Sequence, residues 1–332
     1  MNTHQIDLTV KKRASRNSKK KPSKKNFFLT IKTEKKKSML RIIFYLCVAC
    51  VCAFLVAFEL ISVVAPFVMF PGFYSSRSTN LIPATNRYEP VVVSDSVREG
   101  ILETHQGNFV HYAEIVPTQN ITEIDGLGNA VPRANTLIFY LHGNALTLDT
   151  MWKKVCEDLS LDTGLPVVTH DYTGYGLSSS NVLDVHSVVE DAACLLSKTM
   201  EALGTTQVVL FGRSIGAAVA VHLASRLKRT VEVKLVLETP MLGTKHLRRW
   251  FGISALCSEK FDCRKCLEAT AHVPMLVGLA GRDFIINNDS VIELLKKWRR
   301  KTTEVFIDHT AGHNHMSQTQ WKKKLLVFLF KK

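Results

Sequence analysis

The chain has 332 residues, of which 46% are hydrophobic, 22% charged and 8% aromatic. This composition excludes a small disulfide-stapled scaffold and a wholly disordered chain, and it allows one large domain with extensions. The formal net charge of +14 is unevenly spread, because residues 1–41 hold fourteen Lys and Arg against two acids, Asp7 and Glu34. The rest of the chain carries only +2, from 29 Lys and Arg against 27 Asp and Glu, and is therefore nearly neutral.

The N-terminal 41 residues form a basic tail that we predict to be disordered. Its Lys-, Ser- and Asn-rich stretches cannot bury enough apolar surface to offset the entropy of ordering them. The tail lacks interleaved aromatic residues and a folded reader motif, so no nucleic-acid partner is expected. Beside a membrane span, such a tail is typically a cytosolic topology determinant that contacts anionic lipid.

The following segment, residues 42–65, is predicted to be a transmembrane signal anchor. Ile42 to Phe58 has no charge and no proline, and continuation to Ala65 gives 24 residues, long enough for a hydrocarbon core of about 30 Å. A cleaved signal peptide is disfavoured because its basic region and apolar core would both be too long. The basic residues precede the span, so we expect a cytosolic N-terminus and a lumenal or extracellular body. The endoplasmic reticulum, another endomembrane and the plasma membrane all fit this topology, and residues 66–89 would form a linker.

Two N-glycosylation sequons, at Asn120 and Asn288, agree with a lumenal or extracellular body. The cysteines of the predicted span are interpreted as small apolar residues. The five cysteines of the body are Cys156, Cys194, Cys257, Cys263 and Cys266. Cys263 and Cys266 form a CxxC pair without a fourth ligand at finger-like spacing, so no metal site is expected. A local disulfide within the 257–266 cluster fits an oxidising lumen, and the pairing stays open because the count is odd.

From about residue 90 onward, short apolar runs alternate with helical stretches. Strands are expected at 91–93, 99–104, 109–116, 136–142, 166–172, 206–212, 233–239, 274–281 and 303–308. Helices are expected near 147–162, 184–203, 214–229, 289–301 and 315–331. Such alternation predicts an α/β domain over 90–332, with a mostly parallel, doubly wound sheet and helices on both faces. Residues 241–272 interrupt the rhythm and are expected to form a helical insertion, either an acyl-accepting cap or an ordinary covering helix.

The segment from Gly212 to Gly216 fits the pattern G-x-S-x-G. It follows a predicted strand and opens a predicted helix, which is the context of a nucleophile elbow. A tight turn of this kind presents the hydroxyl of Ser214 at the carboxyl edge of the sheet. The backbone amide of Ile215, at the helix N-terminus, then favours negative charge forming beside the serine.

A serine hydroxyl needs a base, and the expected order in this architecture is serine, acid, histidine. Asp283 follows the strand at 274–281 and is the preferred acid, ahead of Asp289 and Asp308. His313 lies after the last strand and is preferred as the base over its neighbours His309 and His315. A second oxyanion donor is expected from the backbone amide of Asn144, with Ala145 as the alternative; His142, His111, His170 and His222 are interpreted as structural.

Five segments resemble the α/β-hydrolase superfamily, in the expected order and spacing. They are LHGNA (141–145), DYTGYGLS (171–178), FGRSIGAAVAVHLAS (211–225), GRD (281–283) and GHN (312–314). Within the superfamily they are similar to the membrane-anchored Bem46-like group, of the α/β-hydrolase domain-containing protein 13 type. The resemblance implies Ser214 as nucleophile, Asp283 as acid and His313 as base, with a single-pass anchor. The chain departs from the usual pattern at Thr173, where an arginine is frequent.

The predicted function is that of a membrane-anchored serine hydrolase that cleaves an ester or thioester, with a lipid-like substrate. No cofactor is required by such chemistry, and the expected partners are the lipid bilayer and the substrate. The alternative is a catalytically silent membrane scaffold or receptor that retains the fold, because a fold alone does not establish chemistry. The sequence assigns no acyl length and no oligomeric state.

Overall fold

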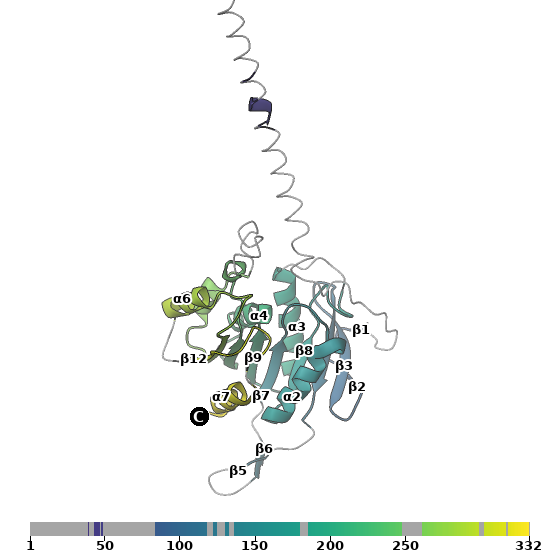
Figure 1. The fold of residues 1–332 in the computed structure, drawn as a ribbon. Coiled ribbons are helices and arrows are strands. Elements are labelled where there is room, and N and C mark those ends of the chain that lie inside the picture. The colour runs from purple at the N-terminus through teal and green to yellow at the C-terminus, as the bar shows by residue number, and fades with distance from the viewer. Residues whose placement is uncertain are drawn as a thin grey trace, which may run out of the picture. The chain divides into compact units, whose positions relative to one another are not determined.

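A computed structural model describes the chain at residues 39, 43–46, 48, 84–117, 122–124, 130–132, 136–179, 185–247, 261–298, 302–316 and 318–331. The chain divides into two compact units, Met1–Phe58 and Glu59–Lys332. In the first unit, the described residues are helical. The second unit holds the α/β fold that positions the site (Figure 1).

A ten-stranded sheet is the centre of the second unit, in the order β1-β3-β4-β8-β7-β9-β10-β11-β12, with β2 paired to β3. The strands are β1 (Ala84–Thr85), β2 (Val91–Val92), β3 (Val97–Glu103), β4 (Phe109–Ile115), β7 (Thr136–Leu141), β8 (Val167–His170), β9 (Gln207–Arg213), β10 (Glu232–Glu238), β11 (Met275–Ala280) and β12 (Thr303–Asp308). From β8 to β12 every neighbouring pair is parallel, whereas β2, β3, β4 and β8 pair antiparallel. The predicted, mostly parallel sheet is therefore confirmed.

Helices cover both faces of the sheet, as the continuous apolar strands require. They are η2 (Leu148–Trp152), α2 (Lys153–Thr163), α3 (Val185–Leu203), α4 (Ile215–Ala224), η3 (Thr244–His246), α5 (Arg264–Ala269), α6 (Asn288–Trp298) and α7 (Gln318–Phe330). Buried side chains of α3, α4, α5 and α6 share one core, and those of α2 and α7 share the other. Strand β7 contributes side chains to both cores. Leu137 and Phe139 belong to the first core, and Ile138 and Tyr140 belong to the second.

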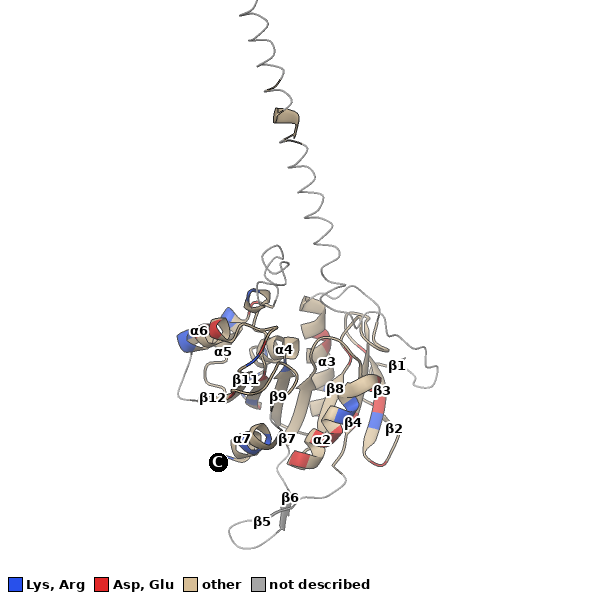
Figure 2. Ribbon diagram, viewed as in Figure 1, with Lys and Arg blue, Asp and Glu red and all other residues tan. Residues whose placement is uncertain are grey.

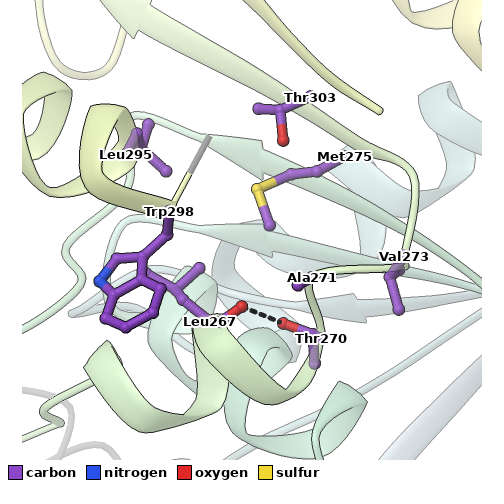
Figure 3. A pocket seen from close by; sticks show the side chains of 8 residues that line it. All are labelled: Leu267, Thr270, Ala271, Val273, Met275, Leu295, Trp298 and Thr303. Carbon is purple, nitrogen blue, oxygen red and sulfur yellow. Dashed lines mark hydrogen bonds between the residues drawn. The ribbon is translucent and has the colours of Figure 1, made fainter. Parts of the chain in front are cut away.

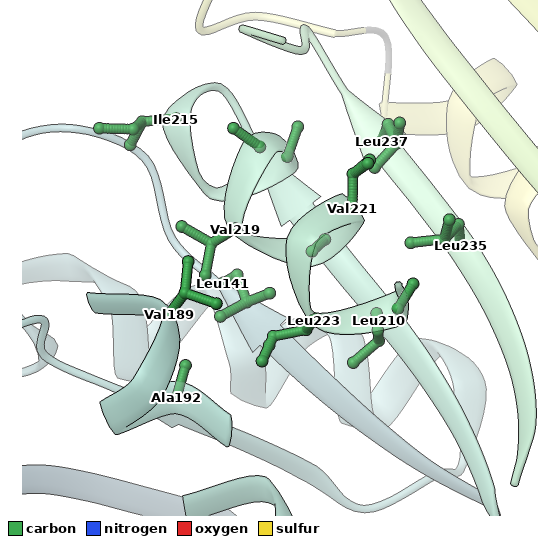
Figure 4. Packing of buried hydrophobic residues seen from close by; sticks show 14 of the residues in the cluster. Leu141, Val189, Ala192, Leu210, Ile215, Val219, Val221, Leu223, Leu235 and Leu237 are labelled. Atoms are coloured by element: carbon green, nitrogen blue, oxygen red, sulfur yellow. The ribbon is translucent and has the colours of Figure 1, made fainter. Parts of the chain in front are cut away.

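Helix α4 is apolar on nearly every side because it is enclosed. Every residue from Ile215 to Ala224 is buried except His222, which is partly buried. Figure 4 shows Val219 toward Val189 of α3 and Val221 toward Leu237 of β10. A helix that is hydrophobic all round belongs in a core. Helix α4 is thus held between the sheet and α3.

Three strands were not foreseen. Strand β1 pairs with β3 inside the stretch predicted to be a linker, and nearby Tyr88 stacks on Tyr112 at 4.9 Å between ring centres. Strands β5 (Thr122–Ile124) and β6 (Ala130–Pro132) form a separate small sheet. All three strands are too short for apolar periodicity to reveal.

The helical insertion was expected at 241–272. Its described parts hold η3 and α5, whereas its centre, 248–260, lies outside the described residues.

A buried carboxylate ties α3 to the loop after β8. Asp191 is 1% exposed and accepts hydrogen bonds from Thr104 Oγ1 at 2.9 Å, Thr173 Oγ1 at 2.6 Å and Asn108 Nδ2 at 3.0 Å. A buried charge is tolerated only when such donors surround it. Thr173, the departure from the usual arginine, is therefore a structural donor in this chain.

Charges of both signs lie along α2, and lysines lie at the end of α6 (Figure 2). Among the described residues, no helix is both long and apolar enough to cross a bilayer. The predicted span at 42–65 lies outside these residues, apart from 43–46 and 48.

Candidate active site

The turn between β9 and α4 presents Ser214 in a backbone conformation that side chains other than glycine rarely adopt. Its φ is 53° and its ψ is −115°. The backbone N–H of Ser214 donates to Glu238 O of the neighbouring strand at 2.9 Å, and Ser214 O accepts from Met241 N at 3.0 Å. Strand β10 therefore clamps the turn from one side, and helix α4 begins directly after it. Strain held in this way is a common feature of functional positions.

Two glycines make the tight turn possible. A Cβ atom on Gly216 would lie 2.0 Å from Leu141 O, and one on Gly212 would lie 2.4 Å from Gly216 O. Real side chains do not approach backbone this closely, so both positions require glycine. The small residues of the G-x-S-x-G pattern thus serve close packing between β7, β9 and α4.

The structure brings Asp283 and His313 to Ser214, as predicted. His313 Nε2 lies 3.1 Å from Ser214 Oγ, and His313 Nδ1 lies 2.7 Å from Asp283 Oδ2. Asp283 is 1% exposed and His313 5% exposed, whereas Ser214 is partly exposed. A hydroxyl, an imidazole in contact with it and a carboxylate in contact with the imidazole thus meet at the carboxyl edge of the parallel strands, an arrangement suited to a nucleophile, a base and an orienting acid.

Backbone hydrogen bonds fix the acid and the histidine. The second carboxylate oxygen of Asp283 accepts from the amides of Ile285 and Ile286, both at 2.8 Å. Asp308, an alternative acid, accepts instead from Thr310 and Ala311 and closes the loop that carries the histidine. Asp308 therefore shapes the loop, and Asp283 is the carboxylate in contact with His313.

The loop after β7 passes beside the nucleophile. A Cβ atom on Gly143 would lie 3.7 Å from Ser214 Cβ. Ala145 and Leu146 both have positive φ, at 66° and 65°. Tyr175 Oη donates to Asn144 Oδ1 at 2.6 Å, so this side chain braces the loop. The backbone amide of Asn144, the candidate oxyanion donor, lies in this loop.

A buried ionic chain supports the same loop from beneath. Asp171 Oδ1 accepts from Leu148 N at 3.0 Å, and His111 lies between Asp171 and Glu99, at 3.5 and 3.1 Å. Lys153 Nζ reaches Glu99 at 2.7 Å. Burial alone would lower the pKa of His111. Its two carboxylate partners raise the pKa by more than burial lowers it, and the resulting pKa is about 9. The pKa of Glu99 is lowered to about 2, mainly because Glu99 is hydrogen-bonded to His111, and burial only partly opposes this shift.

The other histidines have the structural roles expected of them. His142 is buried, its pKa is lowered by burial, and its Nδ1 lies 2.7 Å from Gly143 O. Burial also lowers the pKa of His170, to about 3. His222 faces Cys266 Sγ at 3.3 Å. The alternative bases His309 and His315 are exposed, and His313 is the one that contacts the serine.

The modification candidates have different outcomes. Asn120 and Cys257 lie outside the described residues. Asn288 begins α6, and its Nδ2 donates to Ala280 O at 2.6 Å, so glycosylation there would break a hydrogen bond of the fold. No disulfide joins the described cysteines of the body, namely Cys156, Cys194, Cys263 and Cys266. In the parts of the chain that the structure describes, no three potential ligands gather to hold a metal ion.

The insertion at 241–272 begins next to the loop after β11, which carries Asp283. Leu247 pairs with Ile286 in an isolated bridge, His246 O accepts from Asn287 N at 2.7 Å, and His246 Nδ1 lies 2.8 Å from Ser290 Oγ. The small pocket in Figure 3 lies elsewhere, among Leu267, Thr270, Ala271, Val273, Met275, Leu295, Trp298 and Thr303. Met275 and Thr303 begin their strands, so this pocket is at the amino edge of the sheet, opposite the triad.

Comparison with known proteins agrees with the fold. Residues 132–261 match the family model described as serine aminopeptidase, S33. Alpha/beta hydrolase domain-containing protein 17B of Homo sapiens is 24% identical over 201 residues, which cover 60% of this chain and 67% of that protein. Protein 17C of Mus musculus is also 24% identical, over 60% of this chain and 61% of its own length.

Solved structures give the same result. An esterase of Pyrococcus furiosus superposes with a TM-score of 0.56 at 14% identity, covering 76% of this chain and 98% of its own. An esterase from an Arctic intertidal metagenomic library superposes with a TM-score of 0.53 at 14% identity, covering 73% and 98%. At such low identity these likenesses show the shared fold.

The ionic chain predicts a pH-dependent stability. Because the pKa of His111 is raised on folding, its contribution is fully present below about pH 6.5 and is lost as the pH rises through about 9. The free energy of unfolding should therefore fall over this window by at most about 3 kcal/mol. Urea unfolding of the detergent-solubilised protein at several pH values measures it. His111→Gln should remove this fall, whereas His186→Gln, at an exposed histidine of α3, should keep it. If the free energy of unfolding falls with pH as steeply in His111→Gln as in the wild type, His111 is not the group responsible.

Proposed function

We propose that this chain is a serine hydrolase of the α/β-hydrolase type, which cleaves a carboxylic ester or thioester through an acyl-enzyme on Ser214. The observation that carries the proposal is the continuous hydrogen-bonded series Ser214–His313–Asp283, with contacts of 3.1 and 2.7 Å. Such a series activates a hydroxyl that is otherwise a weak nucleophile.

The catalytic steps follow from the geometry. His313 takes the proton of Ser214 through Nε2 as Oγ attacks the carbonyl carbon, and Asp283 stabilises the imidazolium through Nδ1. The amide of Ile215 is the first of α4 and has no acceptor within that helix. With the Asn144 amide it would bind the tetrahedral oxyanion. His313 then protonates the leaving group, activates a water molecule and so releases the acyl group.

Loss of the nucleophile or the base should abolish turnover. We expect Ser214→Ala and His313→Ala to lower kcat for a p-nitrophenyl ester by at least about 1000-fold. Ser225→Ala, at the other end of α4, serves as the matched control and should keep wild-type kcat. Steady-state hydrolysis by the purified full-length chain provides the measurement. A well-folded wild type without esterase or thioesterase activity would favour the alternative, a catalytically silent scaffold.

Exposed apolar residues beside the triad support a lipid-like substrate. Leu146 is 46% exposed in the loop after β7, and Phe284, next to Asp283, is 57% exposed. Large apolar side chains at the rim of a site suit an acyl chain, because covering them removes apolar surface from water.

The acyl-chain preference tests this part of the proposal. The ratio of kcat/KM for a twelve-carbon over a two-carbon p-nitrophenyl ester should exceed one. Leu146→Ser and Phe284→Ser should each lower this ratio by about 5- to 50-fold, because lost apolar contact affects the long chain alone. Leu161→Ser, at an exposed leucine of α2, is the control and should leave it unchanged. Equal ratios in all variants would show that the acyl chain of the substrate does not bind beside Leu146 and Phe284.

The N-terminal segment completes the proposal. Residues 42–65 would anchor the enzyme as a single-pass membrane protein, with residues 1–41 on the cytosolic side and the hydrolase domain, including Asn120, on the other. The support is the uncharged stretch that directly follows fourteen basic residues. An anchored domain would meet substrates at or near the bilayer surface.

Membrane extraction tests the anchor. The full-length chain should stay with the membrane after alkaline carbonate treatment, and protease added to sealed microsomes should spare the hydrolase domain. A variant with Val51→Arg and Leu55→Arg should be extracted, because each arginine at the centre of a span costs about 3 kcal/mol. Complete extraction of the wild type would rule out a membrane-spanning segment.

A further inference from the structure

Arg213 is the residue before the nucleophile, and its side chain is directed into the protein. This side chain is only 11% exposed, although arginine is usually a surface residue. Its guanidinium contacts residues from three other segments of the site. The triad chemistry does not by itself require any of these contacts.

One contact reaches the loop that carries the base. Arg213 Nη2 donates to Asn314 Oδ1 at 3.3 Å. Asn314 directly follows His313 in the chain, so this hydrogen bond restrains the backbone next to the imidazole. The 3.1 Å contact between His313 Nε2 and Ser214 Oγ depends on that backbone.

A second contact reaches the loop after β7. The guanidinium carbon of Arg213 lies 5.7 Å from the centre of the Trp152 ring, which is a cation–π distance. Trp152 is buried, donates from Nε1 to Ala145 O at 3.2 Å and stacks on His142 at 5.4 Å. Trp152 thus connects Arg213 to the loop after β7, which holds the proposed oxyanion donor Asn144.

A third contact fixes Arg213 itself. Its Nε lies 3.6 Å from Oε1 of Glu238, and the other carboxylate oxygen of Glu238 accepts from Trp321 Nε1 at 2.8 Å. The backbone oxygen of Glu238 accepts from Ser214 N at 2.9 Å. One residue at the end of β10 therefore holds both the nucleophile turn and the arginine, and it compensates the charge of the arginine.

We propose that Arg213 is a positioning residue, which holds the loops of His313 and Asn144 in fixed register with Ser214. The inference rests on the proposed acyl transfer at Ser214. A planar guanidinium can form an ion pair with Glu238 and donate to Asn314 while its face lies on an aromatic ring, which a lysine ammonium cannot do. Misplacement of reacting groups by about 1 Å is enough to slow an enzyme about 100-fold.

A purely structural ion pair with Glu238 would have a different signature. It would change the stability and the fraction of folded enzyme, but not the turnover of each intact site. The kcat per active site therefore separates the two roles, with sites counted by end-point labelling with a fluorophosphonate. The KM tests for a loss of substrate binding.

The test compares variants of the full-length chain on a two-carbon p-nitrophenyl ester. Arg213→Met should lower kcat per labelled site by about 10- to 100-fold, with KM within about twofold of wild type. The kcat of Arg213→Lys should exceed that of Arg213→Met by no more than about threefold, because lysine keeps the charge but lacks the planar guanidinium. Asn314→Ala, at an exposed residue, should lower kcat by about 3- to 10-fold. The double variant should be no slower than Arg213→Met, since both changes remove the same contact.

Arg226→Met is the matched control, because Arg226 forms an ion pair with Glu190 away from the triad. It should keep wild-type kcat and KM. Unchanged kcat per labelled site in Arg213→Met would overturn the inference; if that variant does not fold, unchanged kcat in Asn314→Ala would do so. An inactive and unlabelled wild type would instead overturn the proposed function, so the two failures are distinguishable.

Discussion

The strained turn at Ser214 is the constraint on which the site depends. A serine at a φ of 53° is unfavourable by itself and persists because strand β10 and helix α4 hold it from both sides. The two glycines of the motif permit this packing, since side chains there would meet backbone atoms of β7 and α4. The hydroxyl is thereby presented at the carboxyl edge of the sheet, beside the N-terminus of a buried helix.

The remaining groups reach this turn from loops at the same sheet edge. Parallel strands place their carboxyl ends together, so residues far apart in the chain become neighbours. Asp283 follows β11 and His313 follows β12, and a set of backbone hydrogen bonds holds each loop. Two carboxylates support the arrangement, the buried Asp171 beside the loop after β7 and the partly buried Glu238 beside the turn at Ser214. Each of these carboxylates has donors or cations around it, which makes its burial tolerable.

The sequence was informative where a local rule decides the structure, and silent where distant residues meet. Ser214 was found because a motif, a strand and a helix coincide, and Asp283 and His313 because chain order and post-strand position are general features of the fold. The ionic chain from Lys153 to Asp171 was missed because it joins α2, β3, β4 and the loop after β8, which no spacing rule connects. Arg213 had no predicted role, since only the tertiary structure reveals its contacts with Asn314 and Trp152.

The most direct test of the account is the identity of the residue that becomes covalently modified. Membranes that contain the full-length chain would be treated with a fluorophosphonate, and the modified peptide would be identified by tandem mass spectrometry. We expect a single phosphonylated residue, Ser214, because its hydroxyl contacts an imidazole that is itself oriented by the Asp283 carboxylate. Modification of another serine, or none in folded protein, would contradict it.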